Sequence, residues 1–343
     1  MEKSRHHFFE EITIVKGIAI LLVILGHAIT QTGQEGVFLS KVQQVIYSFH
    51  MPLFFFASGF LSVRLLEAGD WRSRISYGGN RTLRLLIPYF VMGLLYMFAG
   101  AYYFKRPDMI GFPTLLEMAK GGNPDVELWF LYVLWLITVF MVLVVRKRTL
   151  WFWTVIALGG IWASSYALKV NPNLYLFLFY VFYLLLGMLV RCYYPLVRKA
   201  LSETWALVVL LLFFIMGNTG SDWLTALGTA PTHMMQVTLF VVTAVSGLFL
   251  FLSLAIRIAD GVSEDNGGRS FLLLCGDYAM DLYIIAEPIK VLVRIVFWEH
   301  LHWNYLLCTA LCFVIPVVAT LIISRYVVRR SRVLSLLFLG KLS

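Results

Sequence analysis

Apolar residues follow one another in long runs along this chain, and short polar segments separate the runs. Most runs are close to the roughly 20 residues that an α-helix needs to cross the hydrocarbon core of a bilayer. A helix is the expected conformation, because it satisfies its own backbone hydrogen bonds in lipid. The pattern predicts an all-α polytopic membrane protein with about ten transmembrane helices. These cover residues 12–30, 43–66, 83–104, 127–145, 150–168, 173–191, 204–218, 233–256, 271–297 and 303–326.

The composition agrees with this pattern and limits what else the chain can contain. Of its 343 residues, 60% are hydrophobic and 14% are charged, whereas about a quarter of a soluble domain is charged. Ten spans use most of the apolar residues, so we expect one integral membrane domain over residues 1–343 without an appended soluble domain. The first run contains Lys16 and no small-residue cleavage pattern follows it, so we expect a first span and not a signal peptide.

The basic residues predict the orientation in the membrane. If the N-terminus is cytoplasmic, 20 of the 28 lysines and arginines lie on the inner side and 5 on the outer side. Short inner loops of membrane proteins carry such an excess of basic residues. We therefore predict cytoplasmic N- and C-termini in a multi-pass protein of the cell inner (plasma) membrane. The net charge of +9 needs no nucleic-acid partner, because the inner headgroups are anionic.

The four cysteines show no spacing typical of a metal site. Two of them lie one helical turn apart in an apolar run. We expect all four to be small core residues and expect no bound metal. They are Cys192, Cys275, Cys308 and Cys312.

The first span contains two ionisable side chains, Lys16 and His27. Ionisable residues inside a membrane are costly and are functional candidates by default. Eleven helical steps place both side chains on one face, about 16 Å apart along the axis, which is about the reach of the pantetheine arm of coenzyme A. The alternative is that Lys16 snorkels to the inner headgroups and His27 lies at the outer interface.

A second histidine, His50, lies near the outer end of the second span, at about the depth of His27. Two imidazoles at one depth on consecutive spans can meet, and histidine exchanges protons near neutral pH. Metal binding is the rival interpretation, but two imidazoles without a third nearby ligand form a poor site.

Other charged and aromatic residues suggest where substrates bind. Arg81 and Arg84 lie three apart at a predicted cytoplasmic helix start, after Arg72 and Arg74, and guanidinium groups bind phosphate well. The alternative is ordinary positive charge in an inner loop. On the outer side, Glu127 and Trp129 are candidates for binding a sugar, although a plain helix start has the same pattern. Glu287 is either a polar group of a cavity or the structural partner of Lys290.

Together these motifs resemble the membrane acyltransferase-3 family. The resemblance covers nearly the whole chain and is most specific between Lys16 and Ser58. It rests on a basic residue, ten further residues and a histidine in the first span, and on four further motifs. These are Phe49-His50-Met51-Pro52-Leu53-Phe54-Phe55 with Ser58-Gly59, Arg81-Thr82-Leu83-Arg84 before Leu86-Ile87-Pro88-Tyr89, Leu128-Trp129-Phe130-Leu131, and Cys275-Gly276-Asp277-Tyr278 with Leu282-Tyr283-Ile284.

The resemblance implies an acyl-CoA-dependent O-acyltransferase of ten helices. Such an enzyme moves an acyl group, most often acetyl, from cytoplasmic acyl-CoA to a hydroxyl of a cell-surface glycan or its lipid-linked precursor. It implies that His27 is the catalytic histidine, Lys16 its basic partner, and Arg81 with Arg84 the paired-arginine motif. Acyl-CoA is then a co-substrate, and no cofactor is bound permanently. The chain has no long C-terminal extension, so any extracytoplasmic hydrolase-like module is expected on a separate partner protein.

The chain departs from the family pattern at two positions. The acidic residue often found three positions before the first-span basic residue is Thr13, and the histidine common after Tyr283 is Ala286 beside Glu287. Either a neighbouring carboxylate (Glu10, Glu11 or Glu287) substitutes, or the chain is a divergent branch with another acceptor.

Two other classes of function compete with acyl transfer. A transporter or flippase of an anionic or lipid-linked substrate would also contain intramembrane charges and kinking prolines, but transporters commonly show repeated halves and none is visible. A structural scaffold does not explain two histidines at one depth. For the enzyme, we expect His27 to act as general base and His50 to orient it or stabilise charge. A covalent acyl-histidine intermediate stays an open alternative.

Overall fold

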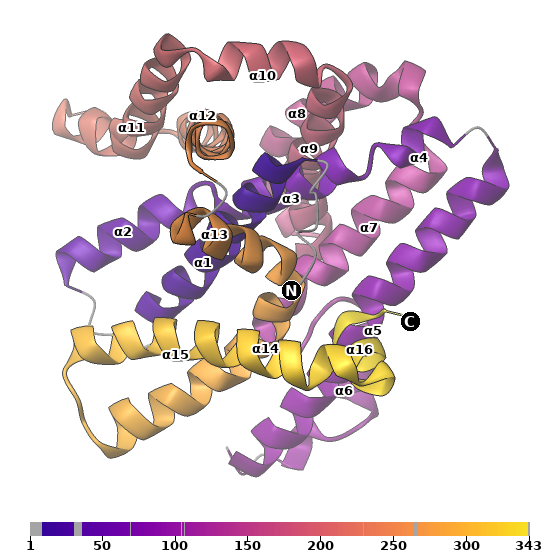
Figure 1. The fold of residues 1–343 in the computed structure, drawn as a ribbon, viewed down its shortest axis with the longest axis vertical. Helices are drawn as coiled ribbons and strands as arrows, with labels where there is room; N and C mark the ends of the chain where they lie inside the picture. The colour runs from indigo at the N-terminus through magenta and orange to yellow at the C-terminus, as the bar shows by residue number, and fades with distance from the viewer. Residues whose placement is uncertain are drawn as a thin grey trace. The chain divides into compact units, whose positions relative to one another are not determined.

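A computed structural model describes residues 9–30, 36–68, 70–103, 105, 107–228, 230–263 and 266–341. Over these residues the chain is helical and contains no strand (Figure 1). The α-helices are α1 (Glu10–Thr30), α2 (Val37–Tyr47), α3 (His50–Leu61), α4 (Arg64–Glu67), α5 (Trp71–Tyr103), α6 (Phe112–Ala119), α7 (Trp129–Leu143), α8 (Leu150–Leu168), α9 (Pro172–Cys192), α10 (Tyr194–Ser202), α11 (Thr204–Ala226), α12 (His233–Gly261), α13 (Gly267–Asp277), α14 (Ala279–Arg294), α15 (Tyr305–Tyr326) and α16 (Arg332–Leu339).

In the described part of the chain, nine helical segments are long and apolar enough to cross a membrane. They coincide with nine of the ten predicted spans, so the all-α polytopic architecture is confirmed. The remaining predicted span, 271–297, consists of two shorter helices, α13 and α14. At Tyr278 between them, the backbone has φ −101° and ψ 15°, which lies outside the α-helical region.

The helices form two compact units, and the chain passes between them at residues 61/62, 182/183 and 321/322. The first unit contains α1 to α3, the end of α9, α10 to α14 and most of α15. The second contains α4 to α8, most of α9, the end of α15 and α16. Each unit is described by itself below.

Glycines bring two pairs of helices in the first unit into backbone contact. A Cβ atom at Gly17 of α1 would lie 2.1 Å from the Leu272 carbonyl oxygen of α13, and one at Gly276 would lie 2.0 Å from the Thr13 carbonyl oxygen. Small residues allow this close approach between membrane helices. The predicted ninth span therefore packs directly along α1 through its first half, α13 (Figure 1).

The contact between α3 and the end of α9 has the same reciprocal form. A Cβ atom at Gly59 would lie 1.9 Å from the Leu184 carbonyl oxygen, and one at Gly187 would lie 2.1 Å from that of Phe56. No side chain fits at either position, because real Cβ atoms do not approach backbone oxygens so closely. These glycines therefore fix how α3, which begins with His50, packs within the unit.

In the second unit, α5 packs against α7 and α16. Helix α16 ends at Gly340, whose φ of 59° is left-handed, a conformation that glycine adopts without steric cost. A Cβ atom there would lie 2.4 Å from the Cα atom of Arg84. The C-terminal helix thus ends directly against the paired-arginine motif of α5.

Candidate functional site

A break between α2 and α3 shapes the site around the two histidines. Helix α2 ends at Tyr47 and α3 begins at His50. Pro52 has no backbone N–H to donate to the carbonyl of Ser48, so regular helical bonding is interrupted there. The backbone N–H of Leu53 does donate to the Phe49 carbonyl, at 2.9 Å. The break places Tyr47 and His50 on either side of a two-residue turn.

Tyr47 lies in ring contact with both histidines. Its ring centroid is 6.1 Å from that of His27 on α1 and 5.1 Å from that of His50. Both histidines of the first two spans therefore lie beside one aromatic ring, and a direct contact between them stays a prediction. The contacts of Tyr47 with the two histidines escaped the sequence analysis.

The hydrogen bond of His50 determines which of its nitrogens is basic. His50 is 6% exposed, and its Nδ1 lies 2.8 Å from the carbonyl oxygen of Ile46. A carbonyl oxygen can only accept, so we assign the proton to Nδ1. In the neutral imidazole, Nε2 is then the nitrogen that can accept a proton from another group.

Lys16 and His27 lie on one uninterrupted helix, α1. Their separation of eleven residues therefore holds as predicted, at about 16 Å along the axis with both side chains on one face. Both residues are half-buried. The face they share begins near the predicted cytoplasmic end of α1 and reaches its outer end.

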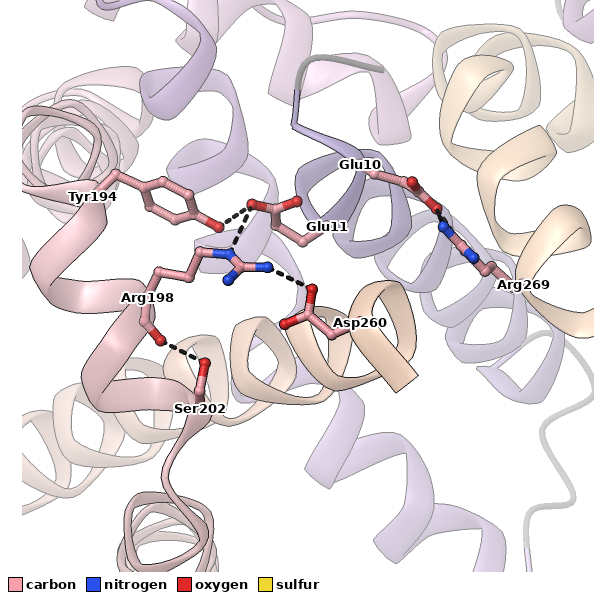
Figure 2. Close-up of polar contacts among 7 residues, drawn as sticks. All are labelled: Glu10, Glu11, Tyr194, Arg198, Ser202, Asp260 and Arg269. Carbon is pink, nitrogen blue, oxygen red and sulfur yellow. Dashed lines mark hydrogen bonds and ion pairs between the residues drawn. The ribbon is translucent and has the colours of Figure 1, made fainter. Parts of the chain in front are cut away.

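Glu10 and Glu11 form contacts at the start of α1 (Figure 2). Glu10 pairs with Arg269 of α13 at 2.6 Å. Glu11 accepts a hydrogen bond from the Tyr194 hydroxyl and lies 3.9 Å from Arg198. These two carboxylates therefore attach the start of α1 to its neighbours, and the substitution of one of them for the family acid at Thr13 stays a prediction.

The same contacts extend through α10 to α12. Arg198 pairs with Asp260 at 2.5 Å, and this contact raises the pKa of Arg198 although partial burial opposes it. Burial, followed by the hydrogen bond to Glu11, raises the pKa of the Tyr194 phenol well above its usual value. Tyr194 therefore stays protonated and donates to Glu11 at neutral pH.

The paired arginines lie on α5 in the second unit. Arg81 is half-buried, donates to the Ser62 hydroxyl at 3.0 Å, and lies over the Tyr77 ring at 5.9 Å. Arg84 is exposed where the end of α16 packs. These positions leave the phosphate-binding role of the two arginines as a prediction.

Arg74 has a different role from the one its sequence position suggested. It is 3% exposed, and its Nη2 donates to the carbonyl oxygens of Met141, Val142 and Val145 at 2.6–2.9 Å. Its Nη1 donates to the Leu65 carbonyl at 2.9 Å. The last carbonyls of a helix have no partner within it, so Arg74 caps α7. Including Arg74 in a phosphate-binding cluster was therefore wrong.

Two of the predicted acceptor residues, Glu127 and Trp129, lie in a hydrogen-bonded segment of the second unit. Asp125 is buried, and its carboxylate accepts from the backbone N–H of Glu127 at 3.1 Å, so it acts as a cap. Glu127 and Trp129 are half-buried. The Trp129 ring lies 5.2 Å from that of Tyr180. Sugar binding by Glu127 and Trp129 stays a prediction.

On α14, Glu287 forms an ion pair with Lys290, which is 1% exposed. The structural pair that the sequence offered as one alternative is therefore present. Substrate binding by Glu287 stays a prediction.

Three of the four cysteines are fully buried, as expected: Cys275, Cys308 and Cys312. Cys192 is exposed at the end of α9, so its assignment to the core was wrong. Among the described residues, no three or more His, Cys, Asp or Glu side chains gather closely enough to hold a metal ion.

Two curated relatives, both named nodulation protein NolL, are similar to part of the chain. The protein from Mesorhizobium japonicum is 33% identical over 108 residues, which are 30% of this chain and 28% of the relative. The protein from Sinorhizobium fredii is 38% identical over 77 residues, 22% of this chain and 20% of the relative. The matched regions thus span less than a third of either relative. No solved structure matches the chain significantly.

The profile of one protein family, described as an acyltransferase domain, matches residues 9–325. The match includes α1 with Lys16 and His27, the histidine of α3, and the paired arginines of α5. The chain therefore belongs to the acyltransferase-3 family.

Proposed function

We propose that the protein is an O-acyltransferase that takes an acyl group, most simply acetyl, from acyl-CoA at the cytoplasmic face of the inner membrane. It delivers this group to a hydroxyl of a cell-surface glycan or a lipid-linked precursor. The observation that carries the proposal is the meeting of His27, Tyr47 and His50 at one end of a helix whose other end carries Lys16. Family membership supports the reaction class.

In this proposal, His27 acts as the general base. Its imidazole takes the proton of the acceptor hydroxyl while the hydroxyl oxygen attacks the thioester carbonyl. The carbon–sulfur bond then breaks, the CoA thiolate leaves, and it takes up the proton that His27 received from the acceptor. His50 is suited to assist, because its Nδ1 bonds to the backbone and leaves Nε2 as the nitrogen that can accept a proton. A positioned base of this kind typically accelerates a reaction about 10²–10⁴-fold.

The donor's phosphates are assigned to Lys16, Arg81 and Arg84. CoA carries several negative charges, and a guanidinium binds a phosphate with two parallel hydrogen bonds. Arg81 and Arg84 belong to the second unit, so their assignment rests on the family motif and on this chemistry. Arg74 is left out because its guanidinium donates to backbone carbonyls. Binding of the acceptor is assigned to Glu127, Trp129 and Glu287. Carboxylates can hydrogen-bond sugar hydroxyls, and an indole ring can stack on a sugar ring.

Two measurements test the proposal against the transporter or flippase alternative. Purified protein in lipid vesicles should consume acetyl-CoA and release CoA when extracts containing surface glycan precursors are present. Mass spectra of surface glycans should show O-acetyl groups in cells with the protein, and none of these groups when its gene is deleted. Unchanged glycans together with no consumption of thioester would contradict acyl transfer and favour transport.

A further inference from the structure

We propose that Tyr47 is a positioning residue of the acyl-transfer site, and that its aromatic ring holds the His27 imidazole toward the acyl acceptor. This inference rests on the proposed function, in which His27 receives the acceptor proton. Tyr47 belongs to none of the motifs to which the sequence assigns a role.

The first argument is the place of the ring. Tyr47 is the last residue of α2, and its ring contacts two imidazoles, at centroid distances of 6.1 Å to His27 and 5.1 Å to His50. Aromatic rings at such distances attract one another beyond the effect of the area they bury. The Tyr47 ring therefore restricts the orientations that the half-buried His27 imidazole can adopt.

The second argument is that α1 is shaped to receive this ring. A Cβ atom at Gly26, the residue before His27, would lie 2.6 Å from Cε1 of Tyr47. The ring thus packs against the backbone of α1 at a glycine, and a Cβ atom there would displace it. One turn earlier on α2, Gln43 donates a hydrogen bond to the Gly26 carbonyl at 3.2 Å. Two contacts therefore fix the end of α2 against the segment that carries His27.

The third argument is that the turn directs its residues to different places. Phe49 is buried and stacks on Phe251 of α12, with centroids 4.6 Å apart and rings 14° from parallel. Tyr47, two residues earlier, is 37% exposed, whereas His50 is 6% exposed. Phe49 anchors the turn in the core, and Tyr47 is the partly uncovered aromatic beside the histidines. In this proposal, an acceptor that approaches His27 and His50 contacts the Tyr47 ring.

The test is acyl transfer by ring variants in the full-length protein. The gene would be deleted from cells that naturally carry the protein, and each variant would be expressed in its place. Membranes from these cells would then receive radiolabelled acetyl-CoA. Alkali-labile label in the glycan fraction reports the O-ester formed. Tyr47→Phe should keep most of the parental kcat, because it keeps the ring. Tyr47→Leu should lower kcat roughly 10–100-fold, the range expected when a reacting group is misplaced, without changing the KM for acetyl-CoA.

Two further variants separate positioning from general damage. Phe38→Leu removes an aromatic ring that is 77% exposed on the same helix, and it should keep the parental kcat. Gly26→Ala should reproduce the effect of Tyr47→Leu by displacing the ring. A protein with both Gly26→Ala and Tyr47→Leu should have the same kcat as Tyr47→Leu alone, because residues that act through one contact give non-additive effects.

The outcomes distinguish this inference from the proposed function. If the parental protein transfers no acetyl group, the proposed function fails and this inference fails with it. If the parental protein is active and Tyr47→Leu keeps its kcat, this inference alone is wrong. Equal losses in Tyr47→Phe and Tyr47→Leu would contradict a role for the ring and assign the effect to the hydroxyl. A raised KM for acetyl-CoA or a lower melting temperature without a loss of kcat would also overturn it.

Discussion

Replacing Arg74 with alanine should destabilise the second unit strongly. The guanidinium is 3% exposed and donates to the carbonyls of four residues, three of them at the end of α7. A hydrogen bond from a charged group contributes about 1.5–3 kcal/mol. Counting the equivalent of two such bonds gives a loss of at least about 3 kcal/mol. At about 2–4 °C per kcal/mol, the apparent melting temperature should fall by roughly 6–12 °C.

The assay is thermal unfolding of the detergent-solubilised protein, with Arg72→Ala as the matched control. Arg72 lies on the same helix and is exposed, so its replacement should leave the melting temperature unchanged. Arg74→Lys should recover only part of the stability, because one ammonium cannot satisfy four carbonyls. The KM of Arg74→Lys for acetyl-CoA should equal that of the parental protein. The reasoning is wrong if Arg74→Ala melts at the temperature of Arg72→Ala, or if Arg74→Lys raises KM while keeping full stability.

Three other predictions concern helix packing, donor binding and pH. Gly59→Ala should reduce the melting temperature, because its Cβ would meet the backbone of α9. Gly159→Ala is the control and should not, because open space surrounds Gly159. Equal melting temperatures for the two variants would contradict the packing argument. Replacing Arg81 and Arg84 together with alanine should raise the KM for acetyl-CoA at least roughly 10-fold, from the loss of about 1.5 kcal/mol or more, and an unchanged KM would make them structural. Tyr194→Phe should be less stable than the parent at pH 7, since a phenol with a raised pKa stabilises the fold below its unfolded pKa near 10. This difference should shrink as pH rises above that value, and a constant difference in melting temperature up to pH 11 would refute the assignment.

The positions of the spans could be predicted from the sequence because hydropathy alone determines which segments enter lipid. The breaks were harder to predict than the spans, because each lies inside one predicted span. Pro52 signals the break before His50, and Gly276 with Asp277 precedes the interruption at Tyr278, but such residues also occur within continuous membrane helices. The histidine pair could be predicted because depth follows from counting residues along a helix.

The roles of individual charges could not be predicted, because they depend on partners that are far away in the sequence. Glu11 bonds to a tyrosine 183 residues later, and Arg269 bonds to a glutamate 259 residues earlier. Arg74 and Arg81 look alike in the sequence, yet one caps a buried helix end and the other does not. Tyr47 was missed because nothing in hydropathy distinguishes a ring beside two histidines from one facing lipid.

The most direct test of the central claim is acetyl transfer by the His27→Ala protein, measured together with its affinity for acetyl-CoA. The account predicts an inserted, folded protein that binds acetyl-CoA as the parent does. Its rate of acetyl transfer should be lower by roughly 10²-fold or more, the scale of losing a general base. His27→Ala protein that transfers acetyl groups at the parental rate would contradict the account.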